Sequence, residues 1–297
     1  MNDFTPQHIP VLADEVLQYL DPQPGQTLID ATVGLGGHSA LLASRLSPDG
    51  RLIGFDRDPA MLELAESRLE SLPVTLIQGS FDQIRQILSN QGIDRVDGIL
   101  ADLGICSAQL DDAERGFSFQ KTGLLDMRMN PLVGESARAL LKRLSEKDLA
   151  DIFYRYGEEK FSRRIARRIV ATRKTEPLET TEQLANLVRS CIPRPKGKKR
   201  EGIDPATRTF QALRIAVNDE LAILEGLLKQ LPRCLNPGGK AVIISFHSLE
   251  DRRVKQTFRE NGFWDILTRK PVQASEEEKE RNPRSRSARL RAAQLSS

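Results

Sequence analysis

The sequence predicts an α/β fold, a doubly wound and largely parallel sheet with helices on both faces, interrupted by an all-helical insertion. Two observations lead to this prediction. Short apolar runs alternate with helical patterns up to residue 104 and again after residue 217, whereas residues 105–216 carry helical patterns. The chain of 297 residues is long enough for two domains. We therefore expect one domain made of residues 1–104 and 217–297 and a separate subdomain made of residues 105–216.

The predicted strands are short, mostly apolar runs bounded by turn residues, which is typical of strands that are buried on both faces. In the N-terminal part they cover residues 27–33, 51–57, 74–79 and 96–102. After the insertion, the pattern predicts a strand at residues 240–246 and a shorter one at residues 263–269. Together these runs complete one sheet.

Helical patterns separate the predicted strands. They cover residues 37–46, 59–71, 83–90 and 249–260. We expect Asp58 to be the N-cap of the second of these helices, with Pro59 in the first helical position, and Asp82 to be the N-cap of the third. A continuous apolar stripe predicts one long helix from Asp204 to about Leu231.

The insertion is predicted to contain several helices. One runs from Ser145 to Tyr156, with Ser145 as its cap, and the next runs from Glu158 to Thr172. In the second helix Phe161, Ile165 and Ile169 recur every four residues, so the arginines between them should lie on the opposite face.

Basic residues are concentrated in the insertion. The whole chain has a net charge of +3, but residues 105–216 hold 23 Lys and Arg against 15 Asp and Glu, a net charge of +8. Three clusters stand out: Arg163, Arg164, Arg167 and Arg168; Arg194, Lys196, Lys198, Lys199 and Arg200; and Arg281, Arg284, Arg286, Arg289 and Arg291. Such clusters suit a phosphate backbone. The alternative is a solvated helix face with disordered tails.

Composition excludes several classes of protein. With 39% hydrophobic and 29% charged residues, the chain is neither collagen-like, nor a coiled coil, nor wholly disordered. No apolar run approaches the length of a membrane span and the N-terminus does not resemble a signal peptide, so we expect a cytoplasmic protein without membrane contact. The three cysteines and three histidines are too far apart in sequence to indicate disulfides or a metal site, and we predict no metal.

A glycine-rich turn at residues 34–38 follows the first predicted strand. Asp56 ends the second strand, 20 residues beyond Gly36, where a carboxylate accepts hydrogen bonds from the hydroxyls of an adenosine ribose. The dinucleotide pattern GxGxxG would require glycine at position 39, where this chain has Ser39. The turn alone is equally typical of a structural turn or a dinucleotide site, and the acidic residues around it favour another cofactor.

Aspartates follow three of the predicted strands. They are Asp30, Asp56 and Asp102, and Phe81 follows a fourth strand, where its ring could cover an adenine. S-adenosylmethionine is a cation without a pyrophosphate, so its site depends on acidic residues more than on a helix N-terminus. Each aspartate by itself could be only an N-cap or a turn residue. Four strand ends together favour S-adenosylmethionine.

Several long and unusual stretches match one known family. They are residues 8–12 (HIPVL), 30–39 (DATVGLGGHS), 102–104 with Ser107, Gln109, Leu110 and Asp111, 115–119 (RGFSF), 126–129 (DMRM), 204–221, 245–252 (SFHSLEDR) and 284–291. On these stretches the chain resembles, over essentially its whole length, the bacterial ribosomal RNA small-subunit methyltransferase H family. That family methylates N4 of a cytidine, at position 1402 in conventional numbering, in 16S rRNA.

The resemblance implies a Rossmann-like class I S-adenosylmethionine-dependent methyltransferase sheet, with the insertion helping to recognise RNA. It implies cofactor contacts at Gly36, Gly37, His38, Asp56, Phe81, Asp102 and Gln109. The implied partner is 16S rRNA, within the assembled 30S subunit. A homodimer is compatible with the sequence.

The exocyclic amine of cytosine is a poor nucleophile, so the protein has to extract the base, orient its nitrogen and stabilise developing positive charge. Many amino-methyltransferases carry an Asp/Asn/Ser-Pro-Pro-aromatic motif for this task, whereas this chain has residues 102–105, Asp-Leu-Gly-Ile. The acceptor is therefore open among Asp102, Ser245 and His247, and a structural role suits His247 equally well.

Two other functions compete with this prediction. The first is methylation of cytosine at C5 with Cys106 as the attacking nucleophile, although no neighbouring Pro-Cys motif supports it. The second is a non-catalytic assembly factor that binds rRNA and retains an old cofactor pocket.

Overall fold

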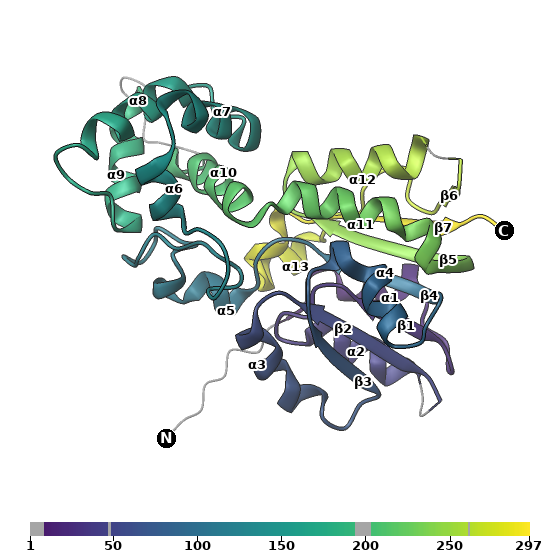
Figure 1. The fold of residues 1–297 in the computed structure, drawn as a ribbon. Coiled ribbons are helices and arrows are strands. Elements are labelled where there is room, and N and C mark those ends of the chain that lie inside the picture. The colour runs from purple at the N-terminus through teal and green to yellow at the C-terminus, as the bar shows by residue number, and fades with distance from the viewer. Residues whose placement is uncertain (1–8, 47–48, 194–202, 261) are drawn as a thin grey trace. The chain divides into compact units, whose positions relative to one another are not determined.

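The structure is a computed structural model that describes residues 9–46, 49–193, 203–260 and 262–297 (Figure 1). The chain divides into two compact units, Met1–Gly104 with Leu221–Ser297, and Ile105–Glu220. We call them the sheet unit and the helical unit. The second junction lies four residues after the expected one at 216/217.

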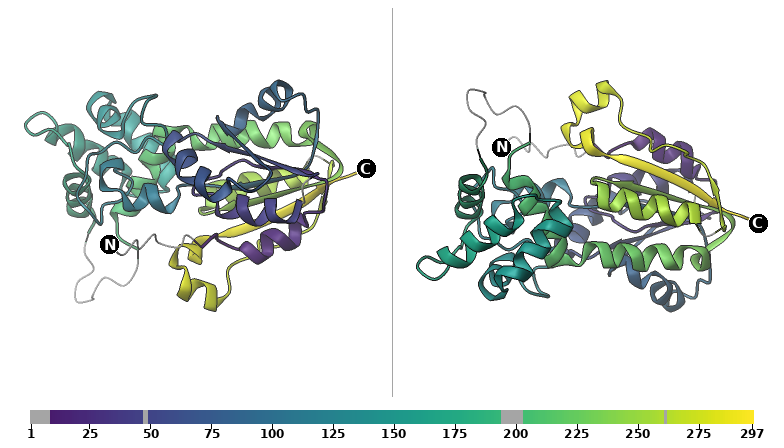
Figure 2. Two further views of the ribbon diagram at one scale, coloured as in Figure 1. Left: turned by 90° about the horizontal axis from the view of Figure 1, so that it is seen from below. Right: turned by 90° about the horizontal axis from the view of Figure 1, so that it is seen from above.

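The sheet unit contains a seven-stranded sheet in the order β3-β2-β1-β4-β5-β7-β6 (Figures 1 and 2). The strands are β1 (Thr27–Asp30), β2 (Arg51–Asp56), β3 (Val74–Gln78), β4 (Val96–Asp102), β5 (Leu235–Ser245), β6 (Trp264–Ile266) and β7 (Arg289–Leu295). Strands β1 to β5 pair in parallel, and β7 is antiparallel to both of its neighbours. The predicted α/β class, a Rossmann-like sheet, is confirmed.

Helices cover both faces of this sheet, as Figure 2 shows. They are α1 (Ala13–Leu20), α2 (Gly37–Leu46), α3 (Pro59–Leu69), α4 (Ile84–Asn90), α11 (Glu220–Cys234) and α12 (Ser248–Glu260). The short helix α13 (Glu276–Arg281) has no buried residues and contacts the 3₁₀ turn η3 (Pro283–Ser287). In β1, Ile29 faces the core covered by α4, α11 and α12, whereas Leu28 faces the core covered by α1 and α2. Ile53 and Leu52 alternate in the same way in β2, as successive strand residues must.

Of the two N-caps expected in the sheet unit, one is confirmed and the other is wrong. Asp58 is confirmed, because its side chain accepts a hydrogen bond of 3.2 Å from the amide of Ala60, with Pro59 in the first turn of α3. Asp82 is wrong as a cap. It lies inside a 3₁₀ turn, η1 (Phe81–Gln83), and the residue before α4 is Gln83.

The long helix expected from Asp204 to Leu231 is also wrong. The structure has two helices, α10 (Ala206–Asn218) and α11, separated by Asp219 in the left-handed conformation at φ 52°. The side chain of Asn218 donates to the carbonyl oxygens of Met127 and Arg214 and accepts from the amide of Met129. These contacts fix the end of α10, so the apolar stripe continues through a break that periodicity does not reveal.

The helical unit is built around its own apolar core. Its helices are α5 (Ser107–Asp111), α6 (Ala137–Arg143), α7 (Glu146–Gly157), α8 (Ser162–Thr172), α9 (Thr181–Cys191) and α10, with a 3₁₀ turn η2 (Ala113–Arg115). Ser145 caps α7 as expected, accepting from the amide of Asp148. Helix α8 begins four residues later than expected, because Glu158 adopts φ 49° and ends α7 instead.

The face of α8 is as expected. Ile165 and Ile169 are buried, and Arg163, Arg164, Arg167 and Arg168 are exposed. Phe161 differs, because it precedes the helix and is 37% exposed. The cluster from Arg194 to Arg200 lies outside the described residues.

The C-terminal basic cluster is not a tail. Strand β7 was not predicted, because its arginines interrupt the apolar alternation, and it lies between β5 and β6 inside the sheet. Arg291 is 6% exposed, and its Nε lies 2.6 Å from Oδ1 of Asp251. For Arg291 the expectation of a phosphate-binding or solvated side chain is therefore wrong.

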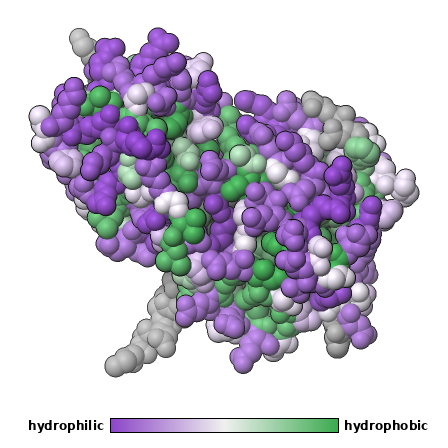
Figure 3. All heavy atoms as spheres, in the orientation of Figure 1, coloured by the Kyte–Doolittle hydropathy of each residue, from purple (hydrophilic) through white to green (hydrophobic). Residues whose placement is uncertain are grey.

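The surface is mainly hydrophilic on the face that Figure 3 shows, with apolar side chains in small groups. Within the described ranges, no helix combines the length and the apolar composition that a membrane span requires.

Candidate functional site

The glycine-rich turn joins β1 to α2. Gly34 and Gly36 both have positive φ, 51° and 75°, which is the conformation expected for this turn. A Cβ atom on Gly36 would lie 3.2 Å from Cδ1 of Leu69. Gly37 is buried as the first residue of α2. The turn therefore needs glycine at position 36 both for its backbone angle and for its contact with α3.

Asp56 joins the glycine-rich turn to the end of β2. Its Oδ2 accepts a hydrogen bond of 2.8 Å from the amide of Gly34, and its Oδ1 accepts one of 2.9 Å from the amide of Asp58. Burial raises the pKa of Asp56 to about 6, although these two amides partly oppose the shift. The carboxylate is thus held beside the turn and is poised to titrate near neutral pH.

Asp30 is a buried side chain that stabilises the glycine-rich turn. It is fully buried, its Oδ1 accepts from the amide of Thr32 at 3.1 Å, and its Oδ2 accepts from the hydroxyl of Ser39 at 2.6 Å. Burial raises the pKa of Asp30, and these hydrogen bonds lower it again in part. Because Asp30 is fully buried and both of its oxygens accept hydrogen bonds inside the turn, it acts as a turn residue, the alternative that the sequence left open.

Asp102 ends β4 beside these groups. Its amide donates to Oγ1 of Thr32 at 2.7 Å, and its Oδ2 lies 3.6 Å from Nε2 of the buried His38. Its Oδ1 is buried and has no hydrogen-bond partner in the described part of the chain. Burial, and then the negative charges of Asp30 and Glu250, raise the pKa of Asp102 well above its usual range. A buried acceptor in this state is suited to a cationic or hydrogen-bond-donating ligand.

The end of β3 carries further buried acceptors. The hydroxyl oxygen of Ser80 and Oδ1 of Asp82 are buried, and neither has a hydrogen-bond partner among the residues that the structure describes. Phe81 between them is partly buried and packs against the core under α4 and α11. An aromatic ring with polar atoms on either side suits a planar heterocycle that carries amine groups.

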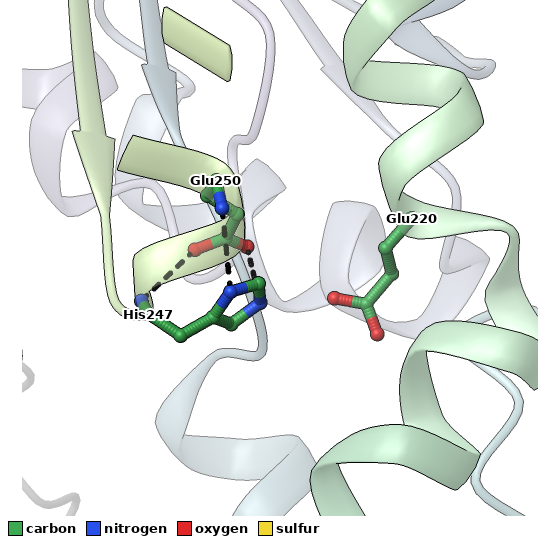
Figure 4. A group of neighbouring side chains, drawn as sticks. All are labelled: Glu220, His247 and Glu250. Carbon is green, nitrogen blue, oxygen red and sulfur yellow. Dashed lines mark hydrogen bonds and ion pairs between the residues drawn. The ribbon is translucent and has the colours of Figure 1, made fainter. Parts of the chain in front are cut away.

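At the end of β5, Ser245 and His247 are held by different partners. The Ser245 hydroxyl donates to the carbonyl oxygen of Arg289 at 3.3 Å. The His247 amide donates to Oε2 of Glu250, and the Glu250 amide donates to Nδ1 of His247 (Figure 4). The Nε2 atom of His247 lies 3.2 Å from Oε1 of Glu250. These reciprocal contacts form the N-terminal cap of α12 and fix the orientation of the imidazole.

Glu250 is the site residue that sequence reasoning missed. It is 2% exposed, it also accepts from the amide of Phe246 at 2.9 Å, and its charge contributes to the raised pKa of Asp102. Glu250 follows His247 by three residues, which is the spacing of a capping box, and this spacing could have identified it from the sequence.

Gln109 and Cys106 belong to the helical unit. The Oε1 atom of Gln109 accepts from the amide of Cys106 at 3.1 Å, in a capping box at the start of α5. The other proposed cofactor residues, Gly36, Gly37, His38, Asp56, Phe81 and Asp102, lie at the carboxyl edge of the sheet unit. The structure thus brings these six together in one unit, while Gln109 has a local structural contact of its own.

Two stretches quoted for the family resemblance meet inside the helical unit. Arg115 donates from its guanidinium to the carbonyl oxygens of Arg128 and Met129, and the amide of Met127 donates to the carbonyl of Arg115. Asn218 of α10 holds the same loop through Met127 and Met129. The loop from 115 to 129 is therefore a fixed part of this unit.

Comparisons with known proteins agree with this geometry. A model described as the MraW methylase family matches residues 5–296. A protein of Acidobacterium capsulatum named ribosomal RNA small subunit methyltransferase H is 50% identical, and the match covers 97% of this chain and 98% of that one. A protein of the same name from Geobacter sulfurreducens is 48% identical over 98% of this chain and 99% of its own length.

Proposed function

The chain belongs to the MraW methylase family, and from this premise we propose that it transfers a methyl group from S-adenosylmethionine to N4 of a cytidine in 16S rRNA. The observation that carries the proposal is the buried, unpartnered Oδ1 of Asp102 beside the glycine-rich turn and Asp56. The relatives' shared name supports the small-subunit rRNA as substrate. We place its action in the cytoplasm, on the assembled 30S subunit.

The sheet edge fits the proposed cofactor. Asp56 accepts the ribose hydroxyls, Gly36 and Gly37 allow the ligand to approach the backbone, and Phe81 covers the adenine. His38 and Asp102 face the cationic part, and the positive charge of a bound sulfonium or ammonium group would favour the ionised form of the Asp102 carboxyl. Gln109 of the helical unit is retained as a further contact on the basis of the resemblance. When bound, S-adenosylmethionine supplies a methyl group that its sulfonium already activates.

The protein's own contribution is orientation and charge stabilisation. The lone pair of the cytosine amine is delocalised into the ring, so the base has to be held with N4 aimed at the methyl carbon. Asp102 is the residue that we assign as acceptor for the amine, because its Oδ1 has no other partner among the described residues. Ser245 retains acceptor lone pairs on its hydroxyl, and the imidazole of His247 is held in place by Glu250.

The affinity for S-adenosylmethionine should fall as the pH is lowered through about 6, the pKa of Asp56 in the free protein. Ribose hydroxyls need the ionised carboxylate as acceptor, so binding at lower pH must release a proton. Below that pKa, the association constant for S-adenosylmethionine should therefore fall by up to about tenfold per pH unit. Calorimetric titrations from pH 5 to pH 8 measure this effect.

Asp56→Asn is the matched control, because it keeps the size of the side chain but cannot titrate. It should bind more weakly at pH 8 and lose this part of the pH dependence, and Asp56→Ala should also weaken binding.

The stability of the free wild-type protein should show the opposite dependence on pH. Its folded state binds the proton at a higher pH than the unfolded state, so stability rises as the pH falls from about 6 towards the usual aspartate range. An affinity independent of pH in the wild type would contradict the assignment of Asp56.

For the RNA we propose that the exposed arginines of α8 contact phosphates. Replacing Arg163 and Arg164 by glutamine should weaken binding of a 16S rRNA fragment and reduce the slope of log K against log salt by about 0.7 for each lost contact. A suitable control is Arg138→Gln with Arg143→Gln, because those guanidinium groups are already paired with Glu179 and Glu135. An unchanged slope in the α8 variant would refute the assignment.

Methylation at C5 predicts a different phenotype. Replacing Cys106 by alanine should keep most of the methyl transfer activity, because in this structure Cys106 caps α5 and its backbone amide is held by Gln109. The measurement is methyl transfer from labelled S-adenosylmethionine into 30S subunits. Complete loss of activity in a variant that folds normally would favour attack by a thiolate and hence the C5 product.

The assembly-factor alternative is tested by the wild-type protein alone. It predicts RNA binding without methyl transfer, whereas the proposed function requires that labelled methyl groups enter 16S rRNA. In the same titrations, absence of S-adenosylmethionine binding by the wild-type protein would favour the assembly factor.

A further inference from the structure

The aromatic side chains of the helical unit fall into two groups. Of the seven Phe and Tyr residues at positions 105–220, five pack in or against the apolar core of this unit. The other two, Tyr154 and Phe161, are 66% and 37% exposed. Both lie within one helical turn of the connection between α7 and α8, which pack against each other (Figure 1). Single exposed apolar residues are common, so the informative feature is that both rings lie at one connection.

The backbone at Phe161 is fixed by hydrogen bonds. Its amide donates to Oε1 of Glu159 at 2.7 Å, and Glu159 is 3% exposed. The amide of Ser162 donates to the carbonyl oxygen of Glu159, and the amide of Ile165 donates to the carbonyl oxygen of Phe161. Phe161 therefore occupies the N-cap position of α8. The partial exposure of its ring belongs to an ordered turn and not to a frayed helix end.

Phe161 lies in line with two arginines of α8. Helix positions three and seven residues apart share one face, so Phe161, Arg164 and Arg168 form a row. Residues 160–175 hold seven Lys and Arg and no acid. Within the described ranges, neither Arg164 nor Arg168 forms an ion pair. The row thus combines an aromatic ring with two guanidinium groups that no described acid neutralises.

We propose that Phe161, Arg164 and Arg168 hold an unpaired segment of the substrate RNA, with a base stacked on the Phe161 ring and phosphates on the guanidinium groups. The inference rests on the proposed function, which makes RNA the partner of this chain. An aromatic ring stacks on the π-face of any base, and a base can reach the ring only where the strand is unpaired. A continuous duplex would offer this surface phosphates and ribose hydroxyls but no free base face. Tyr154 offers a second ring at the same connection.

The test compares two oligonucleotides that differ only in their bases. One is an oligouridylate of about 10 nucleotides, which is unpaired and within the usual size of a single-strand site. The other is an abasic strand of the same length, which keeps the phosphates and lacks the bases. Binding of each strand to the full-length protein is measured over a range of salt concentrations.

Phe161→Ala should bind the oligouridylate at least about fivefold more weakly, as the loss of one stacked base predicts. Its salt slope should be unchanged, because no charge is removed, and it should bind the abasic strand as the wild-type protein does. Arg164→Gln with Arg168→Gln should weaken the binding of both strands and reduce the salt slope by about 1.4, which is about 0.7 for each lost contact.

Three further variants separate stacking from packing. Phe161→Leu keeps an apolar side chain on the turn, so its melting temperature should stay near that of the wild type while binding of the oligouridylate falls. Phe263→Ala removes a ring of the sheet unit that is 56% exposed, and it should bind as the wild type does. Phe161→Trp should retain binding. The chain's single tryptophan, Trp264, is 7% exposed, so quenching by the oligouridylate should report on the added indole.

Four results would overturn the inference. They are wild-type affinity of Phe161→Ala for the oligouridylate, an equal loss of affinity for the abasic strand, an equal loss in Phe263→Ala, and no binding of the oligouridylate by the wild-type protein. If Phe161→Ala binds the oligouridylate normally and loses only binding to whole 30S subunits, the ring contacts a ribosomal protein and the stacking site is likewise refuted.

This inference and the proposed function fail separately. If the wild-type protein shows binding that depends on Phe161 but transfers no methyl group, the stacking site stands and the proposed function falls. If Phe161→Ala binds both strands as the wild type does while the wild-type protein methylates 16S rRNA, the proposed function stands and the stacking site falls.

Discussion

Replacing Asp102 by alanine is expected to lower the single-turnover rate of methyl transfer by about 100-fold or more, the usual effect of losing a positioned charge or acceptor. Its Oδ1 is a buried polar atom of the sheet edge with no partner within the described ranges. Positive charge develops on the cytosine nitrogen during transfer, so loss of this acceptor affects the transition state more than the bound reactants. The rate is measured with labelled S-adenosylmethionine and saturating 30S subunits.

Replacing Asp102 by asparagine should not destabilise the free protein. Burial and the nearby charges of Asp30 and Glu250 disfavour ionisation of Asp102, so Asp102→Asn should keep or raise the melting temperature. Asp97→Asn is the matched control on the same strand. Asp97 holds the amide of Thr27 and the side chain of Asn236, so its loss should lower stability and leave the rate near wild type. A wild-type rate in Asp102→Ala would remove this residue from the mechanism.

Replacing Gly116 by alanine should unfold the helical unit at a much lower temperature. Gly116 has φ 70°, and an added Cβ would lie 2.1 Å from the carbonyl oxygen of Leu124. Because that neighbour is backbone, the loop held by Arg115 and Asn218 would have to move. The expected cost is on the order of 4 kcal/mol, at the upper end for a single substitution. Scanning calorimetry measures it.

Gly134→Ala separates the two causes of this loss. Gly134 also has a positive φ of 82°, but an added Cβ would meet nothing within 4 Å. It should therefore cost only about 1 kcal/mol, the price of the backbone conformation. Both variants should still bind S-adenosylmethionine measurably, because the proposed cofactor site lies in the sheet unit and both glycines lie in the helical unit. Equal destabilisation by the two would contradict the role given to the backbone contact.

Local patterns of the sequence were sufficient for much of the sheet unit. The apolar runs that became β1 to β4 are continuous and bounded by turns, and the Asp58-Pro59 start of α3 combines two independent signals. The glycine-rich turn was predictable because positive φ requires glycine at Gly36. In each case the deciding interaction lies within a few residues of sequence.

The features that could not be predicted depend on contacts between distant segments. The break at Asp219 is fixed by the loop that includes Met127 and Met129, which Asn218 binds across about ninety residues. Strand β7 is stabilised by its neighbours and by the pair of Arg291 with Asp251, forty residues away. Neither leaves a periodic signal.

The proposed chemistry is tested most directly by nucleoside mass spectrometry. Small subunits that lack the modification are incubated with the purified protein and S-adenosylmethionine, and the nucleosides of their 16S rRNA are then analysed. The account predicts one N4-methylated cytidine per subunit, and its absence when Asp102 is replaced by alanine. A 5-methylcytidine product, or no methylated cytidine with the wild-type protein, would contradict it.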